Sequence, residues 1–281
     1  MINILYCGND KIFDGILISL LSICKYSKAQ LNVFVLTANL TDINTAYKAI
    51  SQSHINFLEN TIKETNSESK ITLLDVSDMF REDMINSPNL VNNYTPYTLL
   101  RLYVDLIPEI PEKIIYLDTD TMAHDDIQKL YAVDVKKYEY AAALDYLGKI
   151  FLHYDYQNAG VLLFNVKKMK ETGFLKNVRD YCKYKKMYFP DQTALNSVAK
   201  NKKFLSSRFN DQRKFHKDTV IQHFSKSIRW WPIYHTVNIK PWEIEKMHSV
   251  YKLHEYDDIL QDYQNKKELF IREEVRNNDG N

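Results

Sequence analysis

The fold of this chain is decided by the stretch Lys113-Ile114-Ile115-Tyr116-Leu117-Asp118-Thr119-Asp120. Its apolar part, 114–117, predicts a strand of the kind that is buried on both faces in a parallel sheet. Residues two apart in an extended chain point to the same side, so Asp118 and Asp120 converge just beyond this strand. Open α/β sheets bind ligands at the carboxyl ends of their strands. The two carboxylates are therefore expected to face a ligand.

Two carboxylates placed in this way suit a hard divalent cation. Mg²⁺ and Mn²⁺ take oxygen ligands, and they commonly reach a protein through one or two carboxylates while also holding phosphate groups. The alternative is a solvated turn in which an aspartate caps the helix expected near Asp125. Because the pair follows an Ile-Ile-Tyr-Leu strand, we favour a metal site formed by Asp118 and Asp120.

Outward from this stretch, apolar runs predict strands and capped or amphipathic segments predict helices. The predicted strands are residues 2–6, 31–36, 71–76, 140–144, 161–166 and 219–224, and the predicted helices are residues 16–23, 42–62, 95–106, 167–184 and 192–200. Strands that alternate with helices predict an α/β fold whose sheet is covered on both faces. The polar segment after Trp242 is predicted to be helical.

Composition excludes several classes of protein. The 281 residues can bury one large core or two small ones. The 37 Lys and Arg residues nearly cancel the 36 Asp and Glu residues, so there is no broad positive field for nucleic-acid binding. Three widely spaced cysteines (Cys7, Cys24 and Cys182) make no CxxC motif, which fits a reducing compartment and predicts a cytoplasmic protein.

No targeting or membrane-spanning segment is expected. The most apolar stretch, 15–24, is far shorter than the roughly 20 apolar residues that a spanning helix needs. It also follows an apolar strand, which makes it a poor signal peptide. A peripheral association with the inner face of the cell membrane stays open.

The stretch Leu117 to Thr121 also matches the pattern of a different enzyme class. It resembles the hydrophobic-DxDxT signature of haloacid-dehalogenase phosphatases, in which the first aspartate, here Asp118, is a covalent nucleophile. That signature normally follows the first strand of its domain, whereas here three strand–helix units precede it. The phosphatase is therefore the second reading.

Five segments in one order resemble glycosyltransferase family 8, a family of retaining GT-A enzymes that includes bacterial lipopolysaccharide galactosyl- and glucosyltransferases and glycogenin. The segments are 3–10 (NILYCGND), 97–102 (YTLLRL), 113–120 (KIIYLDTD), 157–165 (QNAGVLLFN) and 191–196 (DQTALN). The resemblance implies a GT-A fold with a Rossmann-like nucleotide-binding part and a mixed central sheet. It covers about residues 2–242 and implies a catalytic domain at 1–242, with a nucleotide-sugar half of about 1–124 and an acceptor half of about 125–242, followed by a helical extension at 243–281.

The resemblance also implies which residues bind the UDP-sugar. Uracil and ribose contacts fall to Asn9 and Lys11, in one turn with Cys7 and Gly8, and Thr119 lies between the two metal-binding aspartates. Arg101 is assigned to the sugar and phosphate region, where a guanidinium can bind in a bidentate manner. Asn158 and Ala159 are assigned to the transferred hexose. The residues nearest the reacting carbon are Asp145, Asp191 and Gln192.

A histidine is expected to complete the metal site, and two registers compete for it. Family members carry a His six residues before the Lys of a Lys-Pro-Trp. His223 keeps that spacing but has Arg229 in place of the Lys and Lys226 in place of a Gly, whereas His235 precedes Lys240-Pro241-Trp242 by one residue too few. We favour His223, because an apolar strand ahead of it can aim the imidazole inward, and we assign Lys226 and Arg229 to the donor. Whether Arg229 or Lys240 contacts the diphosphate stays open.

The implied reaction is transfer of galactose or glucose from a UDP-sugar, with Mn²⁺ or Mg²⁺, to a saccharide, lipid-linked or protein-linked glycan acceptor. A cation and a basic side chain would stabilise the charge that develops on the departing phosphate. Gln192 is a poor nucleophile, so its expected role is positioning and electrostatics. Acceptor recognition is expected in the loop 146–156 and the tail. A third reading, a catalytically inactive sugar- or nucleotide-binding module, stays open.

Overall fold

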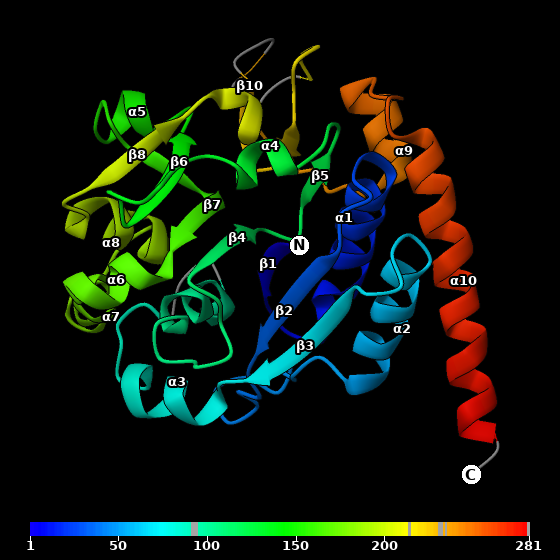
Figure 1. Ribbon diagram of the computed structural model, residues 1–281, viewed down its shortest axis with the longest axis horizontal. Coiled ribbons are helices and arrows are strands. Elements are labelled where there is room, and N and C mark those ends of the chain that lie inside the picture. The colour runs from blue at the N-terminus through cyan, green and yellow to red at the C-terminus, as the bar shows by residue number, and fades with distance from the viewer. Residues whose placement is uncertain (91–94, 213–214, 230–232, 234, 280–281) are drawn as a thin grey trace.

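The computed structural model describes the backbone of residues 1–90, 95–212, 215–229, 233 and 235–279 (Figure 1). Its centre is a seven-stranded sheet in the order β3-β2-β1-β4-β7-β6-β8. The strands are β1 (Ile2–Cys7), β2 (Leu31–Thr37), β3 (Lys70–Asp75), β4 (Lys113–Leu117), β6 (Tyr140–Leu144), β7 (Gln157–Asn165) and β8 (Lys202–Leu205). From β3 to β4 the pairing is parallel, whereas β7 is antiparallel to both β4 and β6. The sheet is therefore mixed.

Alternation along each strand divides the core between the two faces of the sheet. On β4, Ile115 and Leu117 pack on one side, whereas Ile114 and Tyr116 pack on the other. The first face is covered by α1 (Phe13–Tyr26), α2 (Gln52–Lys63) and the long C-terminal helix α10 (Asp257–Asp279), which runs beside α1 (Figure 1). The second face is covered by α3 (Ser77–Met84), the 3₁₀ segment η2 (Pro96–Tyr103), α6 (Val166–Thr172), α7 (Phe174–Tyr184) and α8 (Pro190–Val198).

Two short sheets lie beside the central one. The first pairs β5 (Thr121–Ala123) with β9 (Ile221–His223), and the second pairs β10 (Ser227–Arg229) with β11 (His235–Val237). The remaining described helical pieces are η1 (Asp10–Ile12), α4 (Gln128–Tyr131), α5 (Gly148–Phe151), η3 (Ser207–Phe209), α9 (Ile244–Lys246) and η4 (Met247–Tyr251). Because β5 follows Asp120 directly, its pairing with β9 brings His223 close to the two aspartates.

Several predicted elements differ from the structure. Of the helix expected at 42–62 only α2 forms, because Asn39 and Asn44 hydrogen-bond to backbone N–H groups two residues ahead, which favours turns over helix. The helix expected at 167–184 is two helices, interrupted at Gly173, whose φ of 62° is left-handed. The strand expected at 161–166 begins already at Gln157, so Asn158, Ala159 and Gly160 lie inside a strand.

Two further features bear on the predicted compartment. Cys7, Cys24 and Cys182 are all buried and free, so none forms a disulfide. Among the described helices, none combines the length and the apolar character that crossing a bilayer requires.

Candidate active site

A cavity of about 900 Å³ opens where β4 ends. Its walls come from η2, the ends of β4 and β6, the loop 146–156, the first half of β7, the start of α8, β9, residues 225–227, Asn238 and Lys240. The predicted site residues that line it are Arg101, Asp118, Asp120, Asp145, Asn158, Ala159, Asp191, Gln192, His223 and Lys226. The predicted ones that are not among its described lining residues are Cys7, Gly8, Asn9, Lys11 and Thr119. The side chain of Arg229 lies outside the described residues.

The backbone of the Asp118-Thr119-Asp120 turn is fixed on three sides. The N–H of Asp118 donates to the Gly160 carbonyl of β7 (2.7 Å), and the Asp120 carbonyl accepts from the N–H of Phe224 (2.9 Å). On the third side α1 approaches so closely that a Cβ at Gly15 would lie 2.5 Å from the Thr119 carbonyl oxygen. The turn is therefore positioned by three separate elements, and Thr119 contributes through its backbone.

The two carboxylate oxygens of Asp118 have different partners: one is hydrogen-bonded to buried side chains, and the other faces the cavity. Its Oδ1 accepts from the Arg101 guanidinium (3.0 Å) and from the Tyr116 hydroxyl (2.5 Å), and its Oδ2 faces His223. Arg101 is buried against the Tyr116 ring, 3.8 Å from its centroid, and also donates to the carbonyls of Thr98 and Ala159. Burial alone would lower the pKa of Arg101, but Tyr116, Asp191 and Asp118 raise it, so the guanidinium stays charged.

Arg101 also explains the buried acid Asp191. The Asp191 carboxylate lies 3.4 Å from Arg101 Nε at the start of α8. Burial raises the pKa of Asp191 and the nearby charge of Asp118 adds to this, while Arg101 opposes it. Arg101 is thus paired with two buried or half-buried acids, Asp118 and Asp191.

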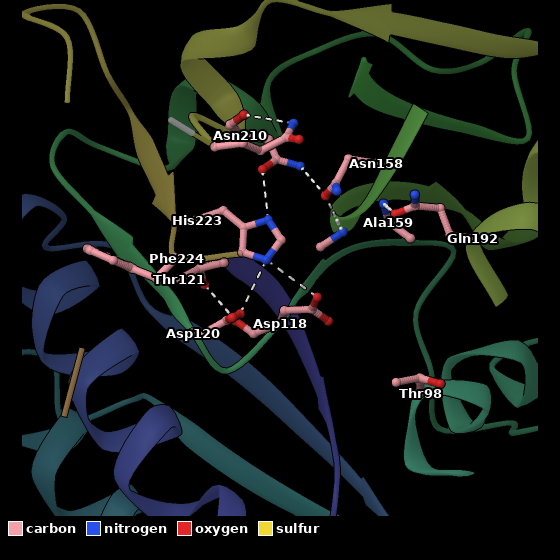
Figure 2. Close-up of polar contacts among 12 residues, drawn as sticks. Thr98, Asp118, Asp120, Thr121, Asn158, Ala159, Gln192, Asn210, His223 and Phe224 are labelled. Carbon is pink, nitrogen blue, oxygen red and sulfur yellow. Dashed lines mark hydrogen bonds and ion pairs between the residues drawn. The ribbon is translucent and has the colours of Figure 1, made fainter. Parts of the chain in front are cut away.

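Asp120 and His223 face each other across the cavity floor (Figure 2). His223 Nε2 lies 3.3 Å from Asp120 Oδ1 and 3.6 Å from Asp118 Oδ2. The other Asp120 oxygen accepts from the ammonium group of Lys240. Burial opposes the charged form of Asp120, but His223 and Lys240 lower its pKa below the usual range. Burial would lower the pKa of His223, but Asp120 and Asp118 raise it.

These three side chains fit a divalent cation. One ligand atom from each of Asp118, Asp120 and His223 can be chosen so that all lie within 4.8 Å of one another. Two carboxylates and one imidazole make a mixed oxygen and nitrogen set of the kind that Mn²⁺ accepts. The His223 Nδ1 lies 3.1 Å from Asn210 Oδ1, so Nε2 is the ring nitrogen that faces the two carboxylates and that a cation would use.

The two candidate histidines occupy different places. His223 is buried on β9, whereas His235 lies exposed on β11 with its Nδ1 near the Ile233 carbonyl. Lys240, the alternative to Arg229 for the diphosphate contact, reaches the cavity and contacts both Asp120 and the Phe224 carbonyl (2.9 Å). The Lys-Pro-Trp motif at 240–242 is its signal in the sequence.

The residues that the sequence predicts for the hexose form one hydrogen-bonded group. Asp145 Oδ1 accepts from the N–H groups of Leu147 and Gly148, and its Oδ2 accepts from Asn158 (2.8 Å) and Gln192 (3.2 Å). Gln192 Oε1 in turn accepts from the N–H of Ala159 (2.9 Å). The carboxamide of Gln192 is thus held between two partners, which suits a positioning role.

The turn that follows β1 lies beside this site. Gly8 donates to the Leu36 carbonyl (3.0 Å), and Asn9 caps η1 by accepting from the N–H of Lys11 (3.3 Å). Since β1 pairs with β4 in parallel, the turn and the Asp118 turn share one edge of the sheet. Burial raises the pKa of Cys7. The charge of Arg101 opposes this rise, and the charge of Asp118 adds to it.

A second group of metal-ligand types lies at the surface. His248 and His254 both contact the carboxylate of Asp257, at 2.6 Å and 3.1 Å. These two His–Asp pairs account for the grouping, which is not part of the cavity lining.

Replacing Gly160 with alanine is expected to displace His223. A Cβ at this position would lie 2.1 Å from His223 Cε1, so the ring must move away from the aspartates. Overpacking of this kind typically costs about 1–3 kcal/mol. Thermal unfolding should show that loss, and Mn²⁺ titration should show weakened binding.

The matched control for that variant is Gly173→Ala. A Cβ at Gly173 meets nothing within 4 Å, so only the strain of its left-handed backbone lowers stability. We expect comparable destabilisation and unchanged Mn²⁺ binding. Equal loss of Mn²⁺ binding in both variants would contradict the contact argument.

Comparison with known proteins relates this arrangement to one family. A model of glycosyl transferase family 8 matches residues 3–245. A putative glycosyltransferase of Haemophilus influenzae is 31% identical over 221 residues, which make up 74% of this chain and 62% of the relative. The chain thus spans less than two thirds of that relative's length.

Solved structures resemble the fold. The galactosyltransferase LgtC, solved with donor and acceptor sugar analogues, superimposes with a TM-score of 0.70 at 18% identity, covering 94% of this chain and all of the other. The bifunctional glycosyltransferase WbbM gives a TM-score of 0.68 at 18% identity, covering 97% of this chain and 51% of the other. The predicted GT-A fold with a mixed central sheet and a C-terminal helix is confirmed.

Proposed function

The chain belongs to glycosyl transferase family 8, and from that premise we propose that it transfers a hexose, galactose or glucose, from a UDP-sugar to a saccharide or glycoconjugate acceptor. The observation that best supports this is the grouping of Asp118, Asp120 and His223 on the floor of the large cavity. The family match favours this reading over the phosphatase. The Asp118 oxygen that Arg101 and Tyr116 occupy is also poorly placed to act as a nucleophile.

We propose that Asp118, Asp120 and His223 hold Mn²⁺ or Mg²⁺, which would neutralise charge on the donor's diphosphate and on the departing phosphate. Lys240, already at the Asp120 carboxylate, and Lys226 on the cavity wall would add positive charge to the same region. Arg101 uses three of its N–H groups on Thr98, Ala159 and Asp118, so its main part is to hold the site together.

On the hexose side, Asp145 and Asp191 would accept sugar hydroxyls while Gln192 stays beside the reacting carbon. Because Gln192 is held by Ala159 and Asp145, it is positioned to polarise and orient, not to form a covalent bond. The acceptor would enter past the loop 146–156, from which Tyr146, Leu147, Gly148, Phe151, Leu152 and Tyr156 line the cavity. The buried free thiols fit a cytoplasmic reaction.

Incubation with Mn²⁺ and UDP-galactose or UDP-glucose, without an acceptor, tests the proposal. Slow release of UDP would support the transferase. Release of phosphate from monoesters would support the phosphatase instead, and thermal stabilisation by UDP-sugar without turnover would support an inactive binding module.

The stereochemistry of the product is a further prediction. Since the family retains the anomeric configuration, an α-linked donor is expected to give an α-linked product. Proton NMR of the isolated glycoside measures this through the coupling of the anomeric proton. A β-linked product would be incompatible with the mechanism proposed here.

A further inference from the structure

Three side-chain hydrogen bonds connect the candidate cation site to the candidate hexose site, and Figure 2 shows the two that join His223, Asn210 and Asn158. His223 Nδ1 bonds Asn210 Oδ1 (3.1 Å), Asn210 Nδ2 bonds Asn158 Oδ1 (2.9 Å), and Asn158 Nδ2 bonds Asp145 Oδ2 (2.8 Å). Asn210 is 1% exposed, and Asn158 and His223 are also buried. Asn210 does not line the cavity, so it acts on a ligand only through its neighbours.

The direction of every bond in this row follows from its fixed ends. The Gly160 N–H can only donate, and it lies 2.9 Å from Asn158, so the Asn158 atom there must be the oxygen. The Asn158 nitrogen then faces the Asp145 carboxylate, which accepts. Asn210 must present its N–H₂ to Asn158 Oδ1 and therefore its oxygen to His223. His223 consequently carries a proton on Nδ1.

From this we propose that Asn210 is a positioning residue, which holds His223 with its Nε2 lone pair toward the cation and joins the cation site to Asp145 through Asn158. The proposal rests on the proposed function, because it assigns Asn210 a role at that site. Without the Asn210 oxygen, no other described residue is a hydrogen-bond partner of Nδ1, and the Asp120 carboxylate favours the proton on Nε2. Without the Asn210 N–H₂, Asn158 Oδ1 still accepts from the Gly160 N–H but loses the hydrogen bond from Asn210.

The backbone around Asn210 is held independently of its side chain. The Asn210 N–H donates to the Ser207 carbonyl (2.9 Å). Asp211 pairs with β9, because its N–H donates to the Ile221 carbonyl and its carbonyl accepts from the His223 N–H. Asp211 itself is anchored by His216 and Thr219. A substitution at Asn210 can therefore change the row of hydrogen bonds without moving the chain that carries it.

Two variants separate the two halves of the role. Asn210→Leu has similar volume and removes both the acceptor and the donor. Mn²⁺ binding, measured by electron paramagnetic resonance of the free ion, is expected to weaken by about 10–100-fold, as is usual when the outer partner of a metal-binding histidine is lost. Asn210→Asp keeps an oxygen for His223, so Mn²⁺ binding should stay near wild type, but it removes the donor to Asn158. Its KM for the UDP-hexose should rise while its affinity for UDP stays unchanged.

The spectroscopic measurement is ¹⁵N NMR of histidine-labelled protein, free of metal and at alkaline pH. The wild type and Asn210→Asp should show His223 with the proton on Nδ1, whereas in Asn210→Leu the proton should shift toward Nε2, which faces the Asp120 carboxylate. The control is Asn32→Leu, which removes a similarly buried amide from β2 and should affect stability alone.

Several results would overturn the inference. One is Mn²⁺ binding within threefold of wild type in Asn210→Leu, and another is an unchanged His223 tautomer. Equal loss of Mn²⁺ binding in Asn210→Asp and Asn210→Leu would also overturn it. The tautomer is measured without donor, metal or turnover, so a failure of the proposed transferase activity is recognised separately.

Discussion

Asp120→Ala is expected to lower kcat/KM for sugar transfer by roughly 10³-fold or more, equivalent to about 4 kcal/mol of transition-state stabilisation. The substitution removes one ligand of the proposed cation and also the carboxylate that holds His223 and Lys240 in place. The two partners that Asp120 leaves behind, His223 and Lys240, carry or accept positive charge, so neither can replace the lost carboxylate as a ligand. Activity should not recover at high Mn²⁺ concentration.

The fold should tolerate this change better than the equivalent change at Asp118. Asp118 partners the buried Arg101 and Tyr116, so Asp118→Ala leaves a buried guanidinium with fewer acceptors and is expected to cost about 2 kcal/mol of stability as well as activity. Asp118→Asn keeps an acceptor for Arg101 and separates the two effects.

Initial rates across a Mn²⁺ titration, together with thermal unfolding, measure both effects. The matched control is Asp126→Ala, six residues further on, where the carboxylate caps a turn at Gln128 and does not line the cavity. Transfer by Asp120→Ala at a rate near that of the control would remove the metal assignment.

His223→Ala should weaken Mn²⁺ and UDP binding by about 100-fold, whereas His235→Ala should leave both near wild type. Losing a ligand is expected to cost at least as much as losing an outer partner, for which 10–100-fold is typical. His223 is buried with Nε2 toward Asp118 and Asp120, and its removal also empties the space against Gly160. His235 is exposed on a two-stranded sheet, and among the described residues its side chain hydrogen-bonds to the Ile233 carbonyl.

The two histidine variants are compared by titrating Mn²⁺ against UDP release and by calorimetry with UDP. His223→Gln keeps a polar group of similar size and tests whether packing alone explains the loss. The reverse order, with His235→Ala impaired and His223→Ala active, would mean that the wrong histidine was chosen.

The sheet was predictable because its strands are apolar runs with clear ends. The strand expected around 114–117 is β4, and the strand expected at 31–36 is β2 with one further residue. The helix at 42–62 was wrong in its first half, because asparagine side chains there bond to nearby backbone and the first true cap is Ser51. The length of a polar segment does not reveal such competition.

The site was predictable only where residues share a motif. Asp118 and Asp120 are separated by one residue in the sequence. Lys240, in contrast, reaches Asp120 across 120 residues, through the pairing of β5 with β9 and the return of the chain after β11. Asn210 belongs to no motif, and its role depends on Asp211 lying beside β9. Strand pairing of this kind is decided by tertiary packing, which spacing along the chain does not describe.

The three buried, free cysteines can be used to measure local opening of the structure by thiol labelling. Cys7 ends β1 beside β4, Cys24 lies in α1 on one face of the sheet, and Cys182 lies in α7 on the other face. Burial raises the pKa of each thiol, so each reacts with a thiol reagent only when its surroundings open. The labelling rates therefore measure three parts of one molecule separately, and a donor bound at the Asp118 turn would slow the reaction of Cys7 more than that of Cys24 or Cys182.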